Sequence, residues 1–377
     1  MEKYLGESIP KLGFGLMRLP MKDGGVDLEQ TTEMVDMFMK AGFRYFDTAY
    51  GYIGGESEKA IGKALVARYP RDSYLLATKL PAWAAKSREE AEQMLATSLE
   101  RTGAGYFDFY LLHNLGEQRT HFFDDYGIWD FLARKKAEGV IRRLGFSFHD
   151  KAAELEKVLD AHPEMDFVQL QINYDDWENP LVESRKCYET ARAHGKPIVI
   201  MEPVKGGNLA NPPENVAKLF RDANPDASPS SWAIRYAASL EGIITVLSGM
   251  STVAQMADNL SYMSAFKPLS DAERVVIDKA RELMDSIPTV PCTGCEYCMK
   301  GCPKHIAIPG TFQAYNMFKV YGNIENARGK YNWNTRGHNL SLASECISCG
   351  RCEAVCPQHI KIRDELKAAA AVLEAKD

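Results

Sequence analysis

The sequence predicts an α/β protein: an eight-stranded parallel (β/α)8 barrel of the TIM type, followed by a small, helix-rich domain built around cysteines. Between residues 11 and 285, short apolar runs alternate with longer stretches of helical period. There are eight such runs over about 240 residues, which is the count and length of a barrel of this type. All but one of the nine cysteines lie after residue 290 of the 377-residue chain. That length suits a barrel plus one small domain.

Each predicted strand is a short run of apolar, β-branched or aromatic residues. We expect strands at residues 11–17, 42–49, 73–79, 106–113, 140–147, 166–173, 196–202 and 242–249. Helices are expected between them, for example at 27–40, 56–69, 87–101 and 181–194, with Asp27, Ser57 and Ser87 as caps near three starts. A doubly wound open sheet is the alternative, and the lack of a G-x-G-x-x-G turn after the first run disfavours it.

Composition divides the chain into four segments. We expect the barrel in residues 1–285, a linker in 286–291, the cysteine-containing domain in 292–360 and a C-terminal helix in 361–377. The Gly-, Pro- and Asn-rich stretch 206–232 is expected to be an ordered excursion after the seventh strand, and the alternative is a long surface loop.

Charge and hydropathy exclude several classes of function. The net charge of −6 gives no electrostatic reason to expect nucleic acid or an anionic membrane as a partner. No run approaches the roughly 18 apolar residues of a membrane-spanning helix, and the first residues do not resemble a secretory signal. A disulfide framework suits short secreted chains, whereas this barrel region is almost free of cysteine. We therefore expect a cytoplasmic protein.

Four side chains of different chemistry stand at or just after the ends of successive predicted strands. Asp47 ends the second strand, Tyr52 follows five residues later, Lys79 ends the third strand and His113 ends the fourth. Catalytic groups of (β/α)8 barrels lie at these carboxyl ends. Tyrosine has a pKa near 10, so a nearby ammonium such as Lys79 would be needed to stabilise its phenolate. Such a set can deliver a proton to a carbonyl oxygen while a hydride reaches the carbon.

The segments YFDTAYGYIGGESEKAIGKAL, LLATKL, DFYLLH and LGFS occur in this order, and with them residues 10–265 resemble the aldo-keto reductase family. The resemblance implies a (β/α)8 fold, a nicotinamide cofactor and a catalytic tetrad of Asp47, Tyr52, Lys79 and His113. It places the catalytic tyrosine five residues after the aspartate, at Tyr52 rather than Tyr50. It also implies reduction of a small-molecule carbonyl or oxidation of an alcohol.

The same resemblance implies which residues hold the cofactor, NADP or NAD. Ser147 and Gln171 would bind the nicotinamide carboxamide, and Met201 replaces a tyrosine that stacks on the nicotinamide in many members. Backbone groups of 203–209, including Pro203, Lys205, Gly206 and Gly207, would line the pyrophosphate, and Ser248, Gly249, Gln255 and Asn259 would hold the adenosine end. Gly249 and Gln255 stand where the family has a lysine and an arginine that grip the 2′-phosphate. We therefore expect a weakened NADPH preference, or NADH use.

Two cysteine runs near the end share one spacing, C-x2-C-x2-C-x3-C-P, which is that of bacterial ferredoxins. They predict a 4Fe-4S ferredoxin-like domain with two [4Fe-4S] clusters, and the alternative is a pair of zinc sites. In two-cluster ferredoxins the fourth cysteine of each run binds the other cluster. We expect one group of Cys292, Cys295, Cys298 and Cys356, and a second group of Cys346, Cys349, Cys352 and Cys302. The long interval between the runs, with helical stretches around 311–321, predicts a helix-rich variant, and Cys187 is expected to be a buried packing residue.

Two other functions stay open at this point. One is a nucleotide-binding redox sensor with a weakly active barrel, and the other is an electron-transfer protein that uses the barrel as a docking platform. For the reductase itself, the simplest role of the clusters is to fold residues 292–360, and the opposing hypothesis is that they pass electrons between the barrel and an external redox partner protein. The sequence names neither the substrate, nor a flavin, nor the oligomeric state.

Overall fold

The computed structural model describes residues 3–5 and 7–375, and they form two compact units. The first unit runs to Val204 and resumes from Ser230 to Asp271, and the second comprises Lys205–Pro229 and the chain from Ala272 onward. The division shows which segments pack together. These units are groups of segments in mutual contact, and they do not test the domain boundaries expected from the sequence, which stay a prediction.

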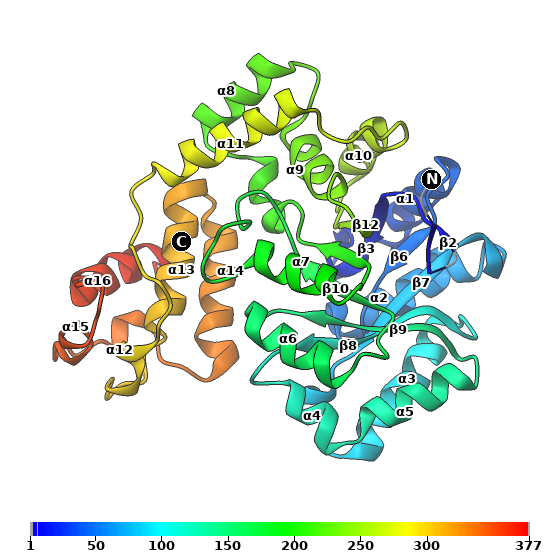
Figure 1. Ribbon diagram of the computed structural model, residues 1–377, viewed down its shortest axis with the longest axis horizontal. Helices are drawn as coiled ribbons and strands as arrows, with labels where there is room; N and C mark the ends of the chain where they lie inside the picture. The colour runs from blue at the N-terminus through cyan, green and yellow to red at the C-terminus, as the bar shows by residue number, and fades with distance from the viewer. Residues whose placement is uncertain (1–2, 6, 376–377) are drawn as a thin grey trace. The chain divides into compact units, whose positions relative to one another are not determined.

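The first unit is a closed barrel of eight parallel strands, in the order β10-β11-β12-β3-β6-β7-β8-β9 (Figure 1). The strands are β3 (Leu12–Gly15), β6 (Tyr45–Asp47), β7 (Leu75–Leu80), β8 (Phe107–Leu115), β9 (Ile141–Phe148), β10 (Phe167–Gln171), β11 (Ile198–Met201) and β12 (Ile243–Ser248). Each one lies within or overlaps a strand expected from the apolar runs. The barrel is confirmed, and the open sheet is excluded because β12 pairs with β3 and closes the ring.

Helices and two short hairpins complete this unit. The helices are α1 (Leu28–Lys40), α2 (Glu56–Ile61), α3 (Arg88–Thr102), α4 (Thr120–Asp125), α5 (Ile128–Ala137), α6 (Ala152–Ala161), α7 (Ser184–Ala193), α9 (Pro229–Ala238) and α10 (Val253–Met263). The hairpins pair β1 (Lys3–Tyr4) with β2 (Glu7–Ser8), and β4 (Met21–Lys22) with β5 (Gly25–Val26). A π turn at Gly62–Val66 continues α2. None of the described helices is long and apolar enough to cross a membrane.

Two of the three expected helix caps are confirmed. Asp27 accepts a hydrogen bond from the Gln30 amide at 3.0 Å, and Ser87 accepts one from the Glu90 amide at 3.2 Å. The prediction for Ser57 is wrong, because this residue lies inside α2. Its hydroxyl donates to the Leu16 carbonyl at 2.9 Å and lies 2.7 Å from the Thr48 hydroxyl, so it joins two strand ends near the barrel mouth.

Both faces of the barrel strands are buried, which explains why they appear in the sequence as continuous apolar runs. Alternate residues point to opposite sides of a strand, so Tyr45 and Leu75 contribute to one hydrophobic cluster while their neighbours Phe46 and Leu76 contribute to another. At Gly145 a Cβ would lie 2.4 Å from the Phe167 carbonyl oxygen, so only glycine allows β9 and β10 to approach this closely.

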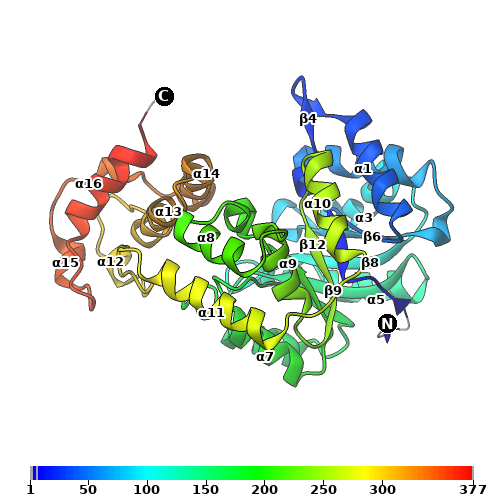
Figure 2. The same cartoon turned by 90° about the horizontal axis from the view of Figure 1, so that it is seen from above.

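The second unit is helical. It contains η6 (Lys205–Ala210), α8 (Glu214–Ala223), α11 (Asp271–Asp285), α12 (Tyr297–Lys300), α13 (Ile308–Tyr321), α14 (Ile324–Asn334), α15 (Arg351–Ala354) and α16 (Ile362–Leu373). Helices α13 and α14 lie side by side in both views (Figures 1 and 2). Phe312, Tyr331 and Leu366 bring α13, α14 and α16 into one hydrophobic core with the cysteines. The helix-rich variant is confirmed, and the excursion after the seventh strand is ordered by η6 and α8.

Candidate active site and cysteine sites

Lys79 is the centre of the group of side chains at the carboxyl end of the barrel. Its ammonium donates to the Asp47 carboxylate, to the Thr48 carbonyl at 2.8 Å and to the Tyr52 hydroxyl at 3.2 Å. Lys79 is fully buried and Asp47 is almost fully buried. The structure therefore brings together three of the four residues that the sequence placed at strand ends.

Tyr52 reaches this position because the chain turns sharply after β6. Ile53, Gly54 and Gly55 all have positive φ (50°, 64° and 93°) within the short helix Tyr52–Gly55. The Arg101 guanidinium lies directly over Gly55, where a Cβ would meet it at 2.8 Å. Tyr50 is held elsewhere, since its carbonyl accepts from Arg101 at 2.9 Å and its ring lies 4.4 Å from that guanidinium.

Burial and charge act in opposite directions on Tyr52. Burial raises the pKa of Tyr52 above its ordinary value, and the Lys79 charge opposes this rise without cancelling it. Burial alone would lower the pKa of Lys79, but the Asp47 carboxylate and the Tyr52 oxygen outweigh it and raise that pKa. Lys79 thus favours the phenolate, as the sequence analysis expected, but its effect is smaller than that of burial. Tyr52 is a neutral phenol at neutral pH, beside a fixed cation.

His113 is the fourth member of the expected tetrad. Its ring lies against the edge of Tyr52, with 5.8 Å between ring centroids and an interplanar angle of 78°. Burial, followed by the charges of Lys79 and other basic groups, holds the pKa of His113 well below its ordinary value. Its buried Nδ1 makes no hydrogen bond with any residue that the structure describes. The imidazole is therefore neutral.

Gln169 holds Asp47 from the opposite side. Its side-chain amide donates to the second Asp47 oxygen at 3.1 Å, and the residue is buried on β10. With Lys79 on one oxygen and Gln169 on the other, the carboxylate is fixed in one orientation. Gln169 lies within the strand predicted at 166–173, and the sequence analysis gave it no role.

Gln171 is held by a buried carboxylate that the sequence analysis missed. The Gln171 and Asn173 amides donate to one oxygen of Asp176, at 3.0 and 2.8 Å, and Asp176 is 1% exposed. The Gln171 amide nitrogen is thus engaged, and its oxygen remains as the acceptor. Ser147, on the neighbouring strand β9, accepts from the Asn114 amide at 2.8 Å. An Asp close behind a strand end was the only sequence signal for this network.

The expected pyrophosphate segment divides between the two units. Met201 ends β11, and Pro203 is buried near the end of this stretch of the first unit. Lys205, Gly206 and Gly207 belong to the second unit. There, the Asn326 amide on α14 donates to the Gly206 carbonyl at 3.2 Å and to the Asn208 side chain at 2.8 Å. The role of Met201, Pro203, Lys205, Gly206 and Gly207 in cofactor binding therefore stays a prediction.

The residues expected at the adenosine end are neighbours on β12 and α10. The Asn259 amide donates to Ser248 at 2.6 Å, and the Tyr262 hydroxyl donates to Asn259 at 2.6 Å. Gln255 accepts from the Ser251 amide at 2.7 Å, which closes the turn at Gly249. Neither Gly249 nor Gln255 brings a positive charge to this turn.

The eight C-terminal cysteines line two hollows, four cysteines in each. The first hollow is lined by Cys292, Cys295, Cys298 and Cys356, and the second by Cys302, Cys346, Cys349 and Cys352. These are the two crossed groups of four expected from the spacing, and Ile308 lines both hollows. That each group binds a cluster stays a prediction.

The two cysteine runs share their backbone conformation as well as their spacing. Gly294 and Glu296 in the first run have positive φ (68° and 61°), and so do Ser348 and Gly350 at the matching places of the second (54° and 78°). Left-handed backbone is unfavourable for Glu and Ser. Its presence at matched positions indicates that the loops are shaped to point their thiols inward.

The donor set fits an iron–sulfur cluster. Burial, with smaller contributions from neighbouring thiols, raises the pKa of Cys292 and Cys352 and raises that of Cys298 to about 12. Four neighbouring thiolates therefore need a positively charged centre to hold them together. The first hollow is lined by the buried apolar residues Ile308 and Phe312 and also by Cys295, which is exposed. Cys187 is buried in the barrel unit, as expected.

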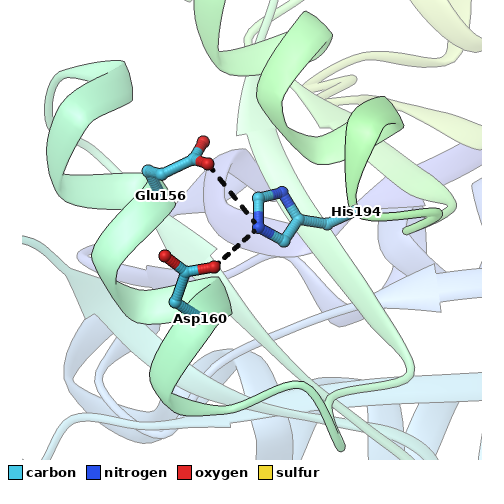
Figure 3. Close-up of side chains that lie close together, drawn as sticks. All are labelled: Glu156, Asp160 and His194. Carbon is cyan, nitrogen blue, oxygen red and sulfur yellow. Dashed lines mark hydrogen bonds and ion pairs between the residues drawn. The ribbon is translucent and has the colours of Figure 1, made fainter.

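A further cluster of titratable groups lies on the outside of the barrel unit, where His194 meets Glu156 and Asp160 of α6 (Figure 3). His194 Nε2 lies 3.2 Å from Asp160 and 3.8 Å from Glu156, and Nδ1 donates to the Thr190 carbonyl at 2.9 Å. These hydrogen bonds, that to Thr190 first, raise the pKa of His194. An imidazolium satisfies both carboxylates, so the cluster is an ion-pair contact between α6 and α7.

Comparisons with known proteins agree with this architecture. Residues 11–282 match the aldo/keto reductase family, and residues 291–360 match a 4Fe-4S dicluster domain. A methylglyoxal reductase of Yersinia pestis is 26% identical over 262 residues, which cover 68% of this chain and 84% of the relative. A 9,11-endoperoxide prostaglandin H2 reductase of Trypanosoma cruzi is 28% identical over 246 residues, which cover 63% and 77%.

Solved structures share the barrel. The holo form of an aldo-keto reductase from Bacillus halodurans aligns with a TM-score of 0.59 and 25% identity, over 73% of this chain and 93% of that one. An aldo-keto reductase of Klebsiella pneumoniae in complex with NADPH shares the fold, with a TM-score of 0.57 and 18% identity over 72% and 90%. Since the family match covers most of the chain, the protein belongs to the aldo/keto reductase family of NAD(P)H-dependent oxidoreductases and carries a C-terminal 4Fe-4S dicluster domain.

Proposed function

We propose that this protein reduces a small-molecule carbonyl, or oxidises the corresponding alcohol, with Tyr52 as the group that exchanges the proton. The observation that carries the proposal is the contact of a buried Lys79 ammonium with both the Asp47 carboxylate and the Tyr52 hydroxyl. When bound, a nicotinamide cofactor supplies or accepts the hydride. The carbonyl carbon gains the hydride and its oxygen gains the Tyr52 proton, so the product is an alcohol.

Each residue of the tetrad has a separate role in this proposal. Tyr52 donates its phenolic proton as negative charge develops on the carbonyl oxygen, and Lys79 stabilises the resulting phenolate. Asp47 keeps Lys79 charged and in place, with Gln169 fixing the carboxylate. Neutral His113 orients the carbonyl oxygen by a hydrogen bond. Because burial raises the pKa of Tyr52, its proton is retained until the substrate oxygen needs it.

The cofactor, NADP or NAD, is proposed to be held by residues on several strands of the barrel. Gln171 and Ser147 would bind the carboxamide, Met201 would pack against the nicotinamide ring, and Ser248, Gly249, Gln255 and Asn259 would hold the adenosine end. For Pro203, Lys205, Gly206 and Gly207 the proposal rests on the family resemblance alone.

We further propose that the two groups of cysteines bind two [4Fe-4S] clusters whose first role is structural. A bound cluster supplies one-electron chemistry, whereas hydride transfer moves two electrons together. The thiols and the apolar residues share one hydrophobic core, so cluster loading would contribute directly to the folding of residues 292–360. Thiolate ligation requires a reducing compartment, which supports the cytoplasm as the location.

Replacement of Tyr52 by Phe tests the catalytic proposal. The variant is expected to bind nicotinamide cofactor almost unchanged and to lose about 100-fold or more in turnover of a generic aldehyde, the size of a lost general acid. Tyr50→Phe is the matched control, because Tyr50 is directed to Arg101 instead of Lys79. Equal losses in the two variants, or a larger loss in Tyr50→Phe, would refute the assignment.

A further inference from the structure

The turn after β12 lacks a positive charge of its own. Gly249 has no side chain, and the Gln255 carbonyl oxygen is engaged by the Ser251 amide. In the function proposed above, this turn and α10 receive the adenosine half of the cofactor, and NADPH differs from NADH by a phosphate on that half. A dianionic phosphate needs a cation or several strong donors to replace its hydration.

Arg18, far away in the sequence, lies beside the position that a side chain at residue 249 would take. A Cβ built on Gly249 would meet Arg18 Cδ, Cβ and Cγ at 3.6, 3.7 and 3.8 Å, with no closer contact. Arg18 ends the short helix Leu16–Arg18 that follows β3, and β3 is the strand paired with β12. The aliphatic part of Arg18 therefore runs along the turn at Gly249.

A hydrogen bond ties the two turns together. The Ser251 hydroxyl donates to the Arg18 carbonyl at 2.7 Å, so the backbone at Arg18 is fixed against the start of α10. The Arg18 guanidinium itself is exposed and makes no hydrogen bond or ion pair with any residue that the structure describes. The backbone is fixed and the guanidinium has no partner to give up in the described part of the chain, so it can receive a phosphate without first breaking an ion pair.

We propose that Arg18 supplies the cation that Gly249 and Gln255 lack, and that it binds the 2′-phosphate of NADPH. The inference rests on the proposed function, since it takes the adenosine half of the cofactor to lie at residues 248–259. It also changes the expectation drawn from the sequence. In this proposal the protein prefers NADPH, and the positive charge that selects it comes from the turn after β3 instead of from β12 and α10.

The test is a direct binding titration of NADPH and NADH to the full-length, cluster-containing protein and to Arg18→Ala, under anaerobic conditions. NADPH affinity is expected to fall roughly 10- to 100-fold, the range for a charge-assisted hydrogen bond to a phosphate, with NADH affinity unchanged. Arg18→Lys should recover part of the NADPH affinity. Lys22→Ala, which removes a nearby exposed positive charge on β4, is the matched control for a general charge effect and should change neither affinity.

Two fragments separate the 2′-phosphate from the rest of the cofactor. Adenosine 2′,5′-bisphosphate should bind the unmodified protein more tightly than adenosine 5′-monophosphate, and Arg18→Ala should abolish the difference. Equal losses for NADPH and NADH would place the contact on the pyrophosphate and overturn the proposal, as would unchanged NADPH affinity in Arg18→Ala. If the unmodified protein bound neither cofactor, the proposed function itself would fail, and this inference with it.

Discussion

Replacing Lys79 by Met removes the cation from the centre of the proposed active site without changing the length of the side chain much. Lys79 and Asp47 are 0% and 3% exposed, so the variant leaves a carboxylate buried without its partner. Gln169 still donates to one oxygen, but an amide carries no compensating charge. The variant is therefore destabilised by the unpaired charge of buried Asp47, and not by a cavity.

The expected loss in the free energy of unfolding is about 3–5 kcal/mol, the range for breaking a buried ion pair at one side. The exposed pair Arg68–Asp36 is the matched control, with side chains 38% and 43% exposed. Arg68→Met should cost at most about 1 kcal/mol. Replacing both Lys79 and Asp47 by apolar residues should recover much of the loss, because no isolated charge then remains.

Urea unfolding followed by tryptophan fluorescence is a suitable assay, because all tryptophans except Trp333 lie in the barrel unit. The pH dependence provides a second check. Burial raises the pKa of Asp47, and removing Lys79 raises it further, so the folded variant binds a proton more tightly than the unfolded chain does. Its stability should therefore fall as pH rises through that pKa, and the deficit relative to the unmodified protein should shrink as the pH is lowered below neutral. A loss no larger than that of Arg68→Met, or a deficit that grows on acidification, would refute the reasoning.

Two further predictions concern the cysteines and the nicotinamide site. Cys349→Ser should lower the iron content by about half and lower the thermal stability, while the protein still reduces an aldehyde with the nicotinamide cofactor. If a folded variant that binds the cofactor lost this activity, the clusters would take part in catalysis. Asp176→Ala removes the acceptor, so it should release Gln171 and weaken NADPH binding by about 1 kcal/mol, the net value of a hydrogen bond. Adenosine 2′,5′-bisphosphate, which lacks the nicotinamide, should bind that variant normally, and an equal loss for both ligands would argue against a local effect.

The strands and the barrel could be predicted because their signal is local. Each strand is buried on both faces, so it must be an apolar run, and its end is marked by a polar residue such as Asp47 or Lys79. The cysteine groups were predictable for a similar reason, since a fixed spacing carries them. Helix α14 was not singled out because its sequence has no clear apolar face, and it is held by packing on α13.

Contacts between distant segments could not be predicted in this way. Ser57 looked like a cap because serine favours that position, but a tertiary hydrogen bond to the Leu16 carbonyl determines its place. The position of Arg18 beside Gly249 depends on the pairing of β3 with β12, which brings together the two ends of the barrel sequence. The sign of the Tyr52 pKa shift depends on the depth of burial, a quantity that motif spacing does not contain.

The crossed arrangement of cysteines also determines the order in which the two sites can be completed during synthesis. Cys292, Cys295 and Cys298 leave the ribosome first, yet their group waits for Cys356, the last of the eight. The other group begins with Cys302 and is complete earlier, at Cys352. Each group takes cysteines from both repeats, so a cluster bound by either group would link the two repeats to one another. A nascent chain that stops between the repeats therefore holds no complete group of four cysteines, and neither site can form before the second repeat has been synthesised.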